Sequence, residues 1–192
     1  GHAVLQVEGL VDDTFLVLNG VRIIDPSIVE RAAEAEEDGE TLVGVIRTED
    51  PSGLGVVETD GERVTGVTEK PPEHAITSEI VNAGVYRFDP GVFDVIRSTD
   101  TSGELTITAT LDRLAAGGTV RALRYRGAWL DVSHLWDLLS VNGSLLDGDL
   151  LDVPETARVG KGAVITDGVA VGPAVRIGPS ATLLPGPAFG AT

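Results

Sequence analysis

The 192-residue chain contains no cysteine, and this absence excludes disulfide bonds, a thiolate nucleophile and zinc–sulfur sites. Its three histidines, His2, His74 and His134, are scattered and leave little for a transition-metal site. Oxygen ligands remain, and because they suit Mg²⁺, this is the cofactor that we expect. Methionine is also absent and the chain begins with Gly1, so we expect a fragment or a processed chain.

Long apolar runs and basic clusters are missing as well. No run approaches the roughly 18 to 20 residues that a membrane span needs, and no signal peptide opens the chain. The net charge of −16 disfavours nucleic acid and anionic lipid as partners. Because 42% of the residues are hydrophobic, we expect a folded, cytoplasmic protein. Thirty acidic residues, with only Lys70 and Lys161 as lysines, favour adaptation to high salt, which screens self-repulsion.

Strand-like and helical patterns alternate over residues 1–147, which predicts an α/β domain. The expected strands are 15–18, 41–47, 55–58, 63–67, 81–88, 120–125 and 129–132. The expected helices begin at Asp25-Pro26 and at Asp89-Pro90, or span 105–116 and 134–146. Gly39 is expected to end the first helix. Because the first strand, helix and strand follow the order of a βαβ unit, we expect a mixed sheet that is mostly parallel.

From about residue 152 the sequence has a six-residue period. An apolar residue recurs at Val153, Val159, Ile165, Val171, Ile177, Leu183 and Phe189. Glycine follows four of these residues, at Gly160, Gly172, Gly178 and Gly190. This hexapeptide repeat is typical of a parallel β-helix, with the apolar residues inside the coil and the glycines and small residues at its tight corners. At about eighteen residues per turn, 152–192 holds little more than two turns, so we expect an incomplete domain and a homo-oligomer.

Six segments, in order, resemble motifs of the sugar-1-phosphate nucleotidyltransferases. They are the Asn19-Gly20 pair after the first strand, GVVE at 55–58, EKP at 69–71, NAGVY at 82–86, GELTIT at 103–108 and WLDV at 129–132. The opening Gly1-His2-Ala3 is similar to the end of a further family segment, GTGHA. The resemblance covers nearly the whole chain. It implies an incomplete Rossmann-like nucleotidyltransferase fold over 1–147, lacking its N-terminal part, followed by a left-handed parallel β-helix over 152–192.

The resemblance also implies a reaction and a set of site residues. A sugar-1-phosphate, such as glucose-1-phosphate, attacks the α-phosphorus of dTTP or UTP, and pyrophosphate leaves. Because two anions must meet, catalysis rests on positioning and charge neutralisation. Lys70 and Asp131 are the implied catalytic residues, the first holding the sugar phosphate and the second binding Mg²⁺. The implied substrate-binding residues are Gly55, Glu69, Lys70, Asn82, Gly84, Glu104 and Trp129.

Several of these residues also have an ordinary structural interpretation. Lys70 could be a solvated surface lysine, and Asn82 a turn or strand-end residue. Glu104 could be an acid at a helix N-terminus. Asp131 could cap the helix that follows it.

The chain departs from the family pattern in two ways. Val21 stands where the family has an aspartate, its other metal ligand, and valine cannot bind a cation. Asp25 lies nearby but is better explained as a helix cap. The family's glycine-rich loop, which cradles the triphosphate, would lie before Gly1. We therefore expect that this chain by itself does not bind nucleoside triphosphate tightly and is not competent.

Two other functions stay open at this point. A bifunctional protein could use the β-helix for acyl transfer, although no histidine follows His134 to serve that chemistry. A non-catalytic regulatory or assembly subunit that binds a sugar nucleotide would explain Val21.

Overall fold

A computed structural model describes most of the chain. The described residues are 1–35, 39–99, 105–146, 153–167, 169–184 and 188–189. They form two compact units, Gly1–Trp129 and Leu130–Thr192, and the boundary falls within strand β8 (Trp129–Asp131). In the described ranges, no helix has the length and apolar character needed to cross a bilayer.

The first unit is built on a six-stranded mixed sheet with the order β1-β6-β3-β7-β5-β4. Its strands are β1 (Phe15–Leu18), β3 (Thr41–Arg47), β4 (Gly55–Asp60), β5 (Arg63–Glu69), β6 (Ile80–Phe88) and β7 (Val120–Tyr125). Strand β2 (Arg22–Ile24) lies outside this sheet. The predicted strands are confirmed, although β4 and β5 are each two residues longer than expected. Their hairpin turns at Gly61, whose φ of +62° suits glycine.

The expectation of a mostly parallel sheet is wrong for the described strands. Among the described strands of this sheet, only β3 and β7 pair in parallel, whereas β1–β6, β6–β3, β7–β5, β5–β4 and β4–β6 are antiparallel. Strands β1 and β3 run parallel to each other, because both are antiparallel to β6, but β6 lies between them. A rule that places consecutive strands side by side cannot foresee the insertion of a strand from later in the chain.

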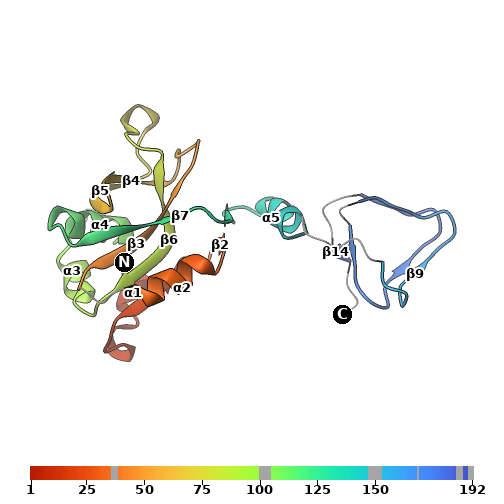
Figure 1. Ribbon diagram of the computed structural model, residues 1–192, viewed down its shortest axis with the longest axis horizontal. Coiled ribbons are helices and arrows are strands. Elements are labelled where there is room, and N and C mark those ends of the chain that lie inside the picture. Colours follow the sequence, from red (N-terminus) through yellow and green to blue (C-terminus); the bar gives the residue numbers. More distant parts are fainter. Residues whose placement is uncertain (36–38, 100–104, 147–152, 168, 185–187, 190–192) are drawn as a thin grey trace. The chain divides into compact units, whose positions relative to one another are not determined.

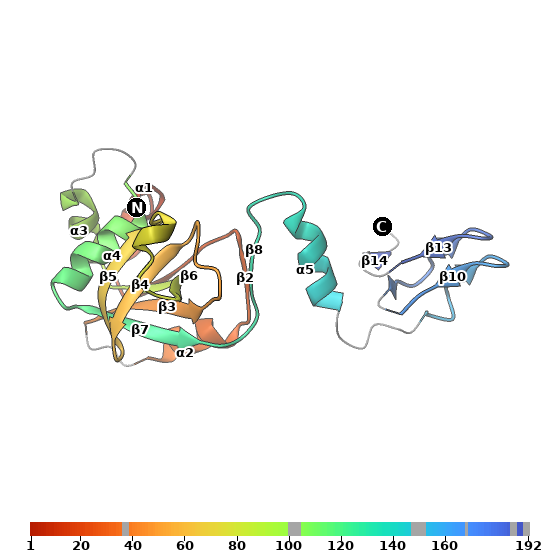
Figure 2. The same cartoon turned by 90° about the horizontal axis from the view of Figure 1, so that it is seen from above.

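Helices cover both faces of this sheet (Figure 1 and Figure 2). Helix α2 (Ser27–Glu34) packs on one face through the buried Ile28 and Ala32. The other face is covered by α1 (His2–Leu5), α3 (Val92–Ser98) and α4 (Ile107–Ala116). Two short 3₁₀ turns are η1 (Glu8–Leu10) and η2 (Glu73–Ala75). A hydrophobic cluster therefore lies on each side of the sheet.

Strand β6 contributes to both clusters because its side chains alternate between the two faces. Ala83 and Val85 belong to the cluster with α2, whereas Tyr86 and Phe88 belong to the cluster with α3 and α4. Asn82 is four and six positions from the residues of the second set. The alternation therefore places Asn82 on the face that α4 covers.

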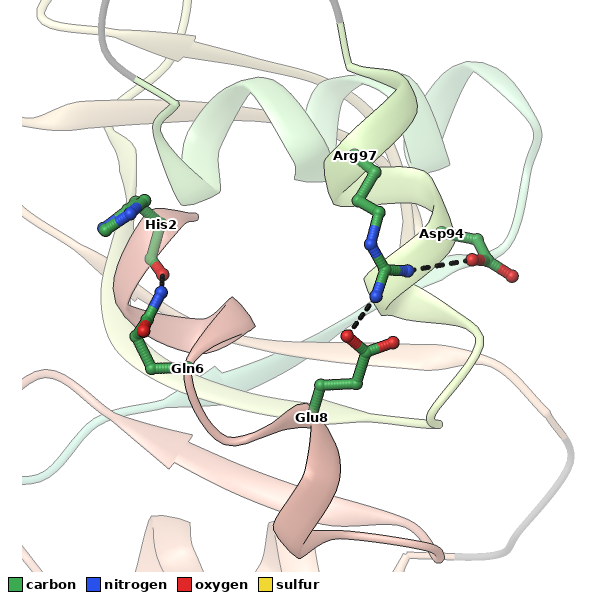
Figure 3. Close-up of polar contacts among 5 residues, drawn as sticks. All are labelled: His2, Gln6, Glu8, Asp94 and Arg97. Atoms are coloured by element: carbon green, nitrogen blue, oxygen red, sulfur yellow. Dashed lines mark hydrogen bonds and ion pairs between the residues drawn. The ribbon is translucent and has the colours of Figure 1, made fainter.

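The N-terminal segment is tied to α3 by side-chain contacts (Figure 3). Arg97 of α3 pairs with Glu8 of η1 and, at 3.0 Å, with Asp94 of its own helix. Gln6 donates a 3.5 Å hydrogen bond to the His2 carbonyl oxygen. Exposed ion pairs add little stability, so the buried Val4 of α1, which packs in the same cluster as α3, supplies the firmer attachment.

The ends of two helices differ from the prediction for local reasons. Asp25 Oδ1 accepts the Ser27 N–H at 2.9 Å, but Pro26 is the N-cap, so the helix begins at Ser27, one residue later than predicted. The helix ends at Glu34, and Gly39, with φ of +75°, does not follow it directly. Helix α4 begins at Ile107 rather than 105, because the side chain of Thr106 accepts the Ala109 N–H at 3.2 Å.

The second unit contains α5 (Asp137–Leu146) and six strands of two residues each. These strands are β9 (Arg158–Val159), β10 (Val164–Ile165), β11 (Ala170–Val171), β12 (Arg176–Ile177), β13 (Thr182–Leu183) and β14 (Ala188–Phe189). Each of the first three pairs in parallel with the strand eighteen residues later: 158 with 176, 164 with 182 and 170 with 188. One six-residue repeat thus provides one strand, and three repeats separate paired strands.

The apolar repeat positions differ in burial along the second unit. Val171, Ile177 and Leu183 are buried together. Val153 and Val159 remain 39% and 46% exposed, so the expectation that every such residue fills the interior is wrong for the first repeats.

Corners of these repeats are not at the predicted glycines. Left-handed backbone occurs at Gly162, Ala174 and Ser180, with φ of +77°, +61° and +59°. Gly160 is required for another reason: a Cβ atom there would lie 2.4 Å from the backbone nitrogen of Pro179. These corners are twelve and six residues apart, in agreement with the six-residue repeat, and all three are small residues as expected. Each corner lies two residues after a glycine of the repeat, at Gly160, Gly172 or Gly178.

Candidate substrate-binding site

Four segments of the first unit converge around Gly55, the first residue of β4. A Cβ atom added to Gly55 would lie 3.3 Å from Glu69 Oε2, 3.6 Å from Asn82 Cβ and 3.9 Å from Thr108 Oγ1. Gly55 pairs with Glu69 across the β4–β5 hairpin, and the next residue of β4 pairs with β6. Strand pairing therefore brings three predicted binding residues together, and the missing side chain of Gly55 leaves room beside them.

Glu69 is held by a residue that the sequence did not single out. Thr108, in the first turn of α4, donates from Oγ1 to Glu69 Oε2 at 2.6 Å, and it is only 4% exposed. Among the described residues, Glu69 Oε1 has no hydrogen-bond partner and can accept a ligand hydroxyl. Thr108 closes the GELTIT segment, so its place in that motif was the available signal. The low helix propensity of threonine gives Thr106 and Thr108 a different meaning at the sequence level, since both weaken the prediction of a helix over 105–116.

Asn82 is fixed at both ends of its amide. Its Oδ1 accepts the Gly84 N–H at 2.9 Å, and its Nδ2 donates to the Tyr86 hydroxyl oxygen at 2.7 Å. Burial is the main cause that raises the pKa of Tyr86 to about 12, and the negative charge of Glu69 also raises this pKa. The hydrogen bond from Asn82 and the positive charge of Arg22 lower it. Asn82 is therefore an oriented side chain in mid-strand, which is a different role from the strand-end residue considered above.

Gly84 has a conformation and a neighbour that both require glycine. Its φ is +82°, and a Cβ atom there would lie 2.8 Å from the Cβ of Asn19. The Asn19 N–H donates to the Gly84 carbonyl oxygen at 2.8 Å, so the end of β1 lies directly beside β6. The register of β6 against β3 shifts at this point, between Val43 and Val45. Gly84 thus brings the Asn19-Gly20 segment close to Asn82.

Trp129 is oriented by contacts within the first unit. Its indole Nε1–H donates to the Ala83 carbonyl oxygen at 3.1 Å, and the guanidinium carbon of Arg22 lies 4.5 Å from the ring centroid. The tryptophan predicted to bind substrate therefore attaches to β6 next to Gly84. A cation over an aromatic ring at this distance is a favourable contact.

Lys70 directly follows Glu69 and has left-handed backbone, with φ of +44°. Its N–H donates to the Leu54 carbonyl oxygen at 3.1 Å, so the strained turn is held beside Gly55. Lysine rarely adopts this conformation, and strain of this kind concentrates at functional sites. The side chain is exposed and can reach a ligand at the Gly55 site.

Two further predicted site residues, Glu104 and Asp131, lie outside the described part of the first unit. Glu104 lies outside the described residues. Asp131 belongs to the second unit, where its Oδ2 accepts the Ser133 hydroxyl at 2.5 Å. Asp137 Oδ2, at the start of α5 (Asp137–Leu146), accepts the Ser133 and His134 N–H groups at 3.0 and 2.7 Å. The described residues contain no group of three acidic or histidine side chains that could hold a metal.

A partly open pocket lies elsewhere in the first unit. It measures about 370 Å³ at the carboxyl ends of β3 and β7, and its lining includes Arg47, Arg124 and Arg126. None of its lining residues belongs to the predicted set. The candidate site is at Gly55 rather than in this pocket, because four predicted residues and one contact residue meet there. They are Gly55, Glu69, Lys70 and Asn82, with Thr108 as the contact of Glu69. The Gly55 site is an open surface, with Glu69 and Lys70 both exposed.

Comparison with known proteins decides the family. A model of the family described as "Nucleotidyl transferase" matches residues 1–148. The chain belongs to the nucleotidyl transferase family. It is 35% identical over 150 residues to the "Bifunctional protein GlmU" of Methanococcus maripaludis, covering 77% of this chain and 35% of that protein. It is 31% identical over 191 residues to the "Glucose-1-phosphate thymidylyltransferase" of Streptomyces antibioticus, covering 91% and 53%.

A third relative and a solved structure extend this comparison. The "UTP--glucose-1-phosphate uridylyltransferase AglF" of Haloferax volcanii is 33% identical over 140 residues, covering 69% of this chain and 57% of that protein. A putative glucose-1-phosphate thymidylyltransferase from Bacillus anthracis has a similar fold, with a TM-score of 0.65 at 23% identity, covering 79% and 62%. The chain spans only 35 to 57% of the length of the three curated relatives. The α/β nucleotidyltransferase fold with a mixed sheet is thereby confirmed.

Proposed function

We propose that this chain provides the sugar-phosphate half of an enzyme that joins a nucleoside triphosphate to a sugar-1-phosphate. The products are a nucleotide sugar and pyrophosphate. The observation that supports this most strongly is the convergence of Glu69, Asn82 and the strained Lys70 around Gly55. Glucose-1-phosphate with dTTP or UTP is the proposed substrate pair, because similar relatives are named for glucose-1-phosphate thymidylyl and uridylyl transfer.

The charge of each side chain indicates which part of the sugar phosphate it would bind. A carboxylate repels phosphate, so Glu69 suits sugar hydroxyl groups, and the Asn82 amide can both donate to and accept from them. Lys70, the next residue along the chain, suits the phosphate and would neutralise its charge. Held in this way, the phosphate oxygen of the sugar is placed for in-line attack on the α-phosphorus, and positioning of this kind supplies much of the rate in phosphoryl transfer. Glu104 and Trp129 complete the proposed binding residues.

Magnesium fits this proposal with Asp131 as its protein ligand. At position 21, the valine is 46% exposed and offers no oxygen, so the donor set is a single carboxylate. Mg²⁺ commonly uses one or two carboxylates together with waters and substrate phosphates, and one carboxylate meets that requirement. The ion would neutralise phosphate charge during the transfer. Because nucleoside triphosphates and magnesium are abundant in the cytoplasm, we propose a cytoplasmic location.

The second unit supports a left-handed β-helix that joins copies of the protein into a homo-oligomer. Parallel pairing at eighteen residues and corners spaced at multiples of six residues support the coil. Acyl transfer has less support, although some relatives are named bifunctional, since no histidine follows His134. A non-catalytic sugar-nucleotide-binding subunit is the second candidate function, and the exposed Val21 favours it.

Release of pyrophosphate tests the proposal directly. The full-length protein, expressed from its natural gene, would be incubated in high salt with Mg²⁺, glucose-1-phosphate and each nucleoside triphosphate in turn. Release that requires both substrates is the expected result, and it would also identify the base. Absence of release with every pair, from protein that is folded by circular dichroism, would overturn the enzymatic proposal. Binding of a nucleotide sugar under those conditions would then favour the subunit.

A further inference from the structure

Glu69 and Asn82 are each held by one buried hydroxyl group. Thr108 and Tyr86 are both only 4% exposed, and both come from the α4 side of the sheet. Neither hydroxyl faces solvent, so neither is suited to contact a substrate itself. Each is within hydrogen-bond distance of a residue that the proposed function places against the sugar.

Glu69 without such a bond would be free to turn. It is an exposed side chain at the end of β5 with several rotamers. Thr108 belongs to a helix whose start is fixed by the Thr106 cap, so its hydroxyl holds a constant position. The 2.6 Å bond to Oε2 therefore selects one orientation of the carboxylate and leaves Oε1 directed to a ligand. Fixing a flexible side chain before binding reduces the entropy lost on binding.

Asn82 is oriented from the opposite side of Gly55. The ring of Tyr86 stacks on Phe88, with centroids 5.7 Å apart and planes within 12°, so its hydroxyl is also held in place. With Oδ1 accepting from Gly84 and Nδ2 donating to Tyr86, the amide cannot flip without losing both bonds. One N–H of Nδ2 and one lone pair of Oδ1 remain for a ligand.

We propose that Thr108 and Tyr86 are positioning residues, whose hydroxyls hold Glu69 and Asn82 in the orientation that binds sugar hydroxyl groups. The ligand is the neutral polyol portion of a phosphorylated sugar. The unused donor and acceptor positions of Glu69 and Asn82 match hydroxyl groups, and the Glu69 carboxylate repels an anion. This inference rests on the proposed function and adds the residues that determine which hydroxyl is recognised.

The test compares Thr108→Val with Thr108→Ser in the full-length protein. The matched control is Thr110→Val, because Thr110 is buried in the same helix and its hydroxyl donates only to the Thr106 carbonyl oxygen. We expect Thr108→Val to raise KM and the calorimetric Kd for glucose-1-phosphate about tenfold, with kcat changed less than about threefold. Thr108→Ser and Thr110→Val should stay within about twofold of the wild type. Tyr86→Phe should also raise Kd.

Monodeoxy analogues of glucose-1-phosphate separate positioning from a structural effect. If Glu69 binds one hydroxyl, the analogue lacking that hydroxyl should bind wild type and Thr108→Val equally, while the others keep the tenfold difference. Equal losses in Thr108→Val and Thr110→Val, or a loss that is the same for every analogue, would overturn the inference. Calorimetry gives this answer even if the wild type releases no pyrophosphate, and that result would count against the proposed function alone.

Discussion

Gly55→Ala tests whether the space above β4 is where the sugar sits. The added methyl carbon would lie 3.3 Å from Glu69 Oε2 and 3.6 Å from Asn82 Cβ, so it enters the centre of the site. The backbone accepts alanine, and the Glu69 carboxylate is exposed and can shift by a few tenths of an ångström. Alanine in place of glycine also restricts the unfolded chain, and this stabilises the folded state by roughly 0.5–1 kcal/mol. We therefore expect the free energy of unfolding to change by less than about 1 kcal/mol.

The effect of Gly55→Ala on catalysis should be much larger than its effect on folding. A displacement of about 1 Å in a reacting group can cost about 100-fold in rate. We expect kcat/KM for glucose-1-phosphate in the full-length protein to fall by about 100-fold, which is about 2.7 kcal/mol of transition-state stabilisation. Initial rates of pyrophosphate release and urea unfolding measure the two quantities.

The control for Gly55→Ala is Gly66→Ala on the neighbouring strand. A Cβ atom at Gly66 would lie 3.3 Å from Glu58 Oε2, so the new methyl group meets a carboxylate at the same distance, outside the site. This variant should keep kcat/KM within about twofold. A folded Gly55→Ala protein with activity within threefold of the wild type would refute the placement of the sugar.

Three further predictions concern folding, pH and the metal. Gly84→Ala should destabilise the fold by at least about 2 kcal/mol in urea, because alanine disfavours φ of +82° and its Cβ would meet Asn19 at 2.8 Å. Because the pKa of Tyr86 is about 12 when folded and near 10 when unfolded, its stabilising contribution is complete below about pH 10 and is lost as the pH rises toward 12. The free energy of unfolding, measured in urea, should be lower at pH 11.5 than at pH 9, and Tyr86→Phe should reduce this difference. Val21→Asp in the full-length protein should raise turnover at saturating Mg²⁺ at least about tenfold, and unchanged turnover would contradict the loss of a ligand.

The sequence predicted those parts of the site that depend on short-range pairing. Glu69 lies opposite Gly55 because a hairpin joins their strands, and a turn signal in the sequence is enough to place both. Asn82 follows because β6 pairs with the same hairpin. Thr108 could not be placed in this way, since its contact with Glu69 depends on how α4 packs across the sheet, which no local pattern encodes.

Sheet order was less predictable than the strands themselves. The apolar runs of β1 and β3 identified both strands, and their parallel direction followed from the helix between them. Nothing in either run shows that β6 enters between them, because its own run, Ile80–Phe88, has apolar residues on both faces and would fit any central position. Gly84, which is predicted as a binding residue, also lets β1 approach β6 closely, and this packing role could not be foreseen from the sequence.

The close approach of β1 and β6 at Gly84 also fixes the backbone position of Val21. Asn19 donates its N–H to Gly84, accepts the Arg22 N–H on its carbonyl oxygen at 3.1 Å and accepts the Val21 N–H on Oδ1 at 3.4 Å. The turn that contains Val21 is thus attached to the strand that presents Asn82, two residues from the point of attachment. The backbone of this turn is held in place whichever side chain position 21 has. An exchange between valine and aspartate at position 21 should leave these backbone bonds intact, and for that reason the single substitution Val21→Asp suffices to test the proposed loss of a metal ligand.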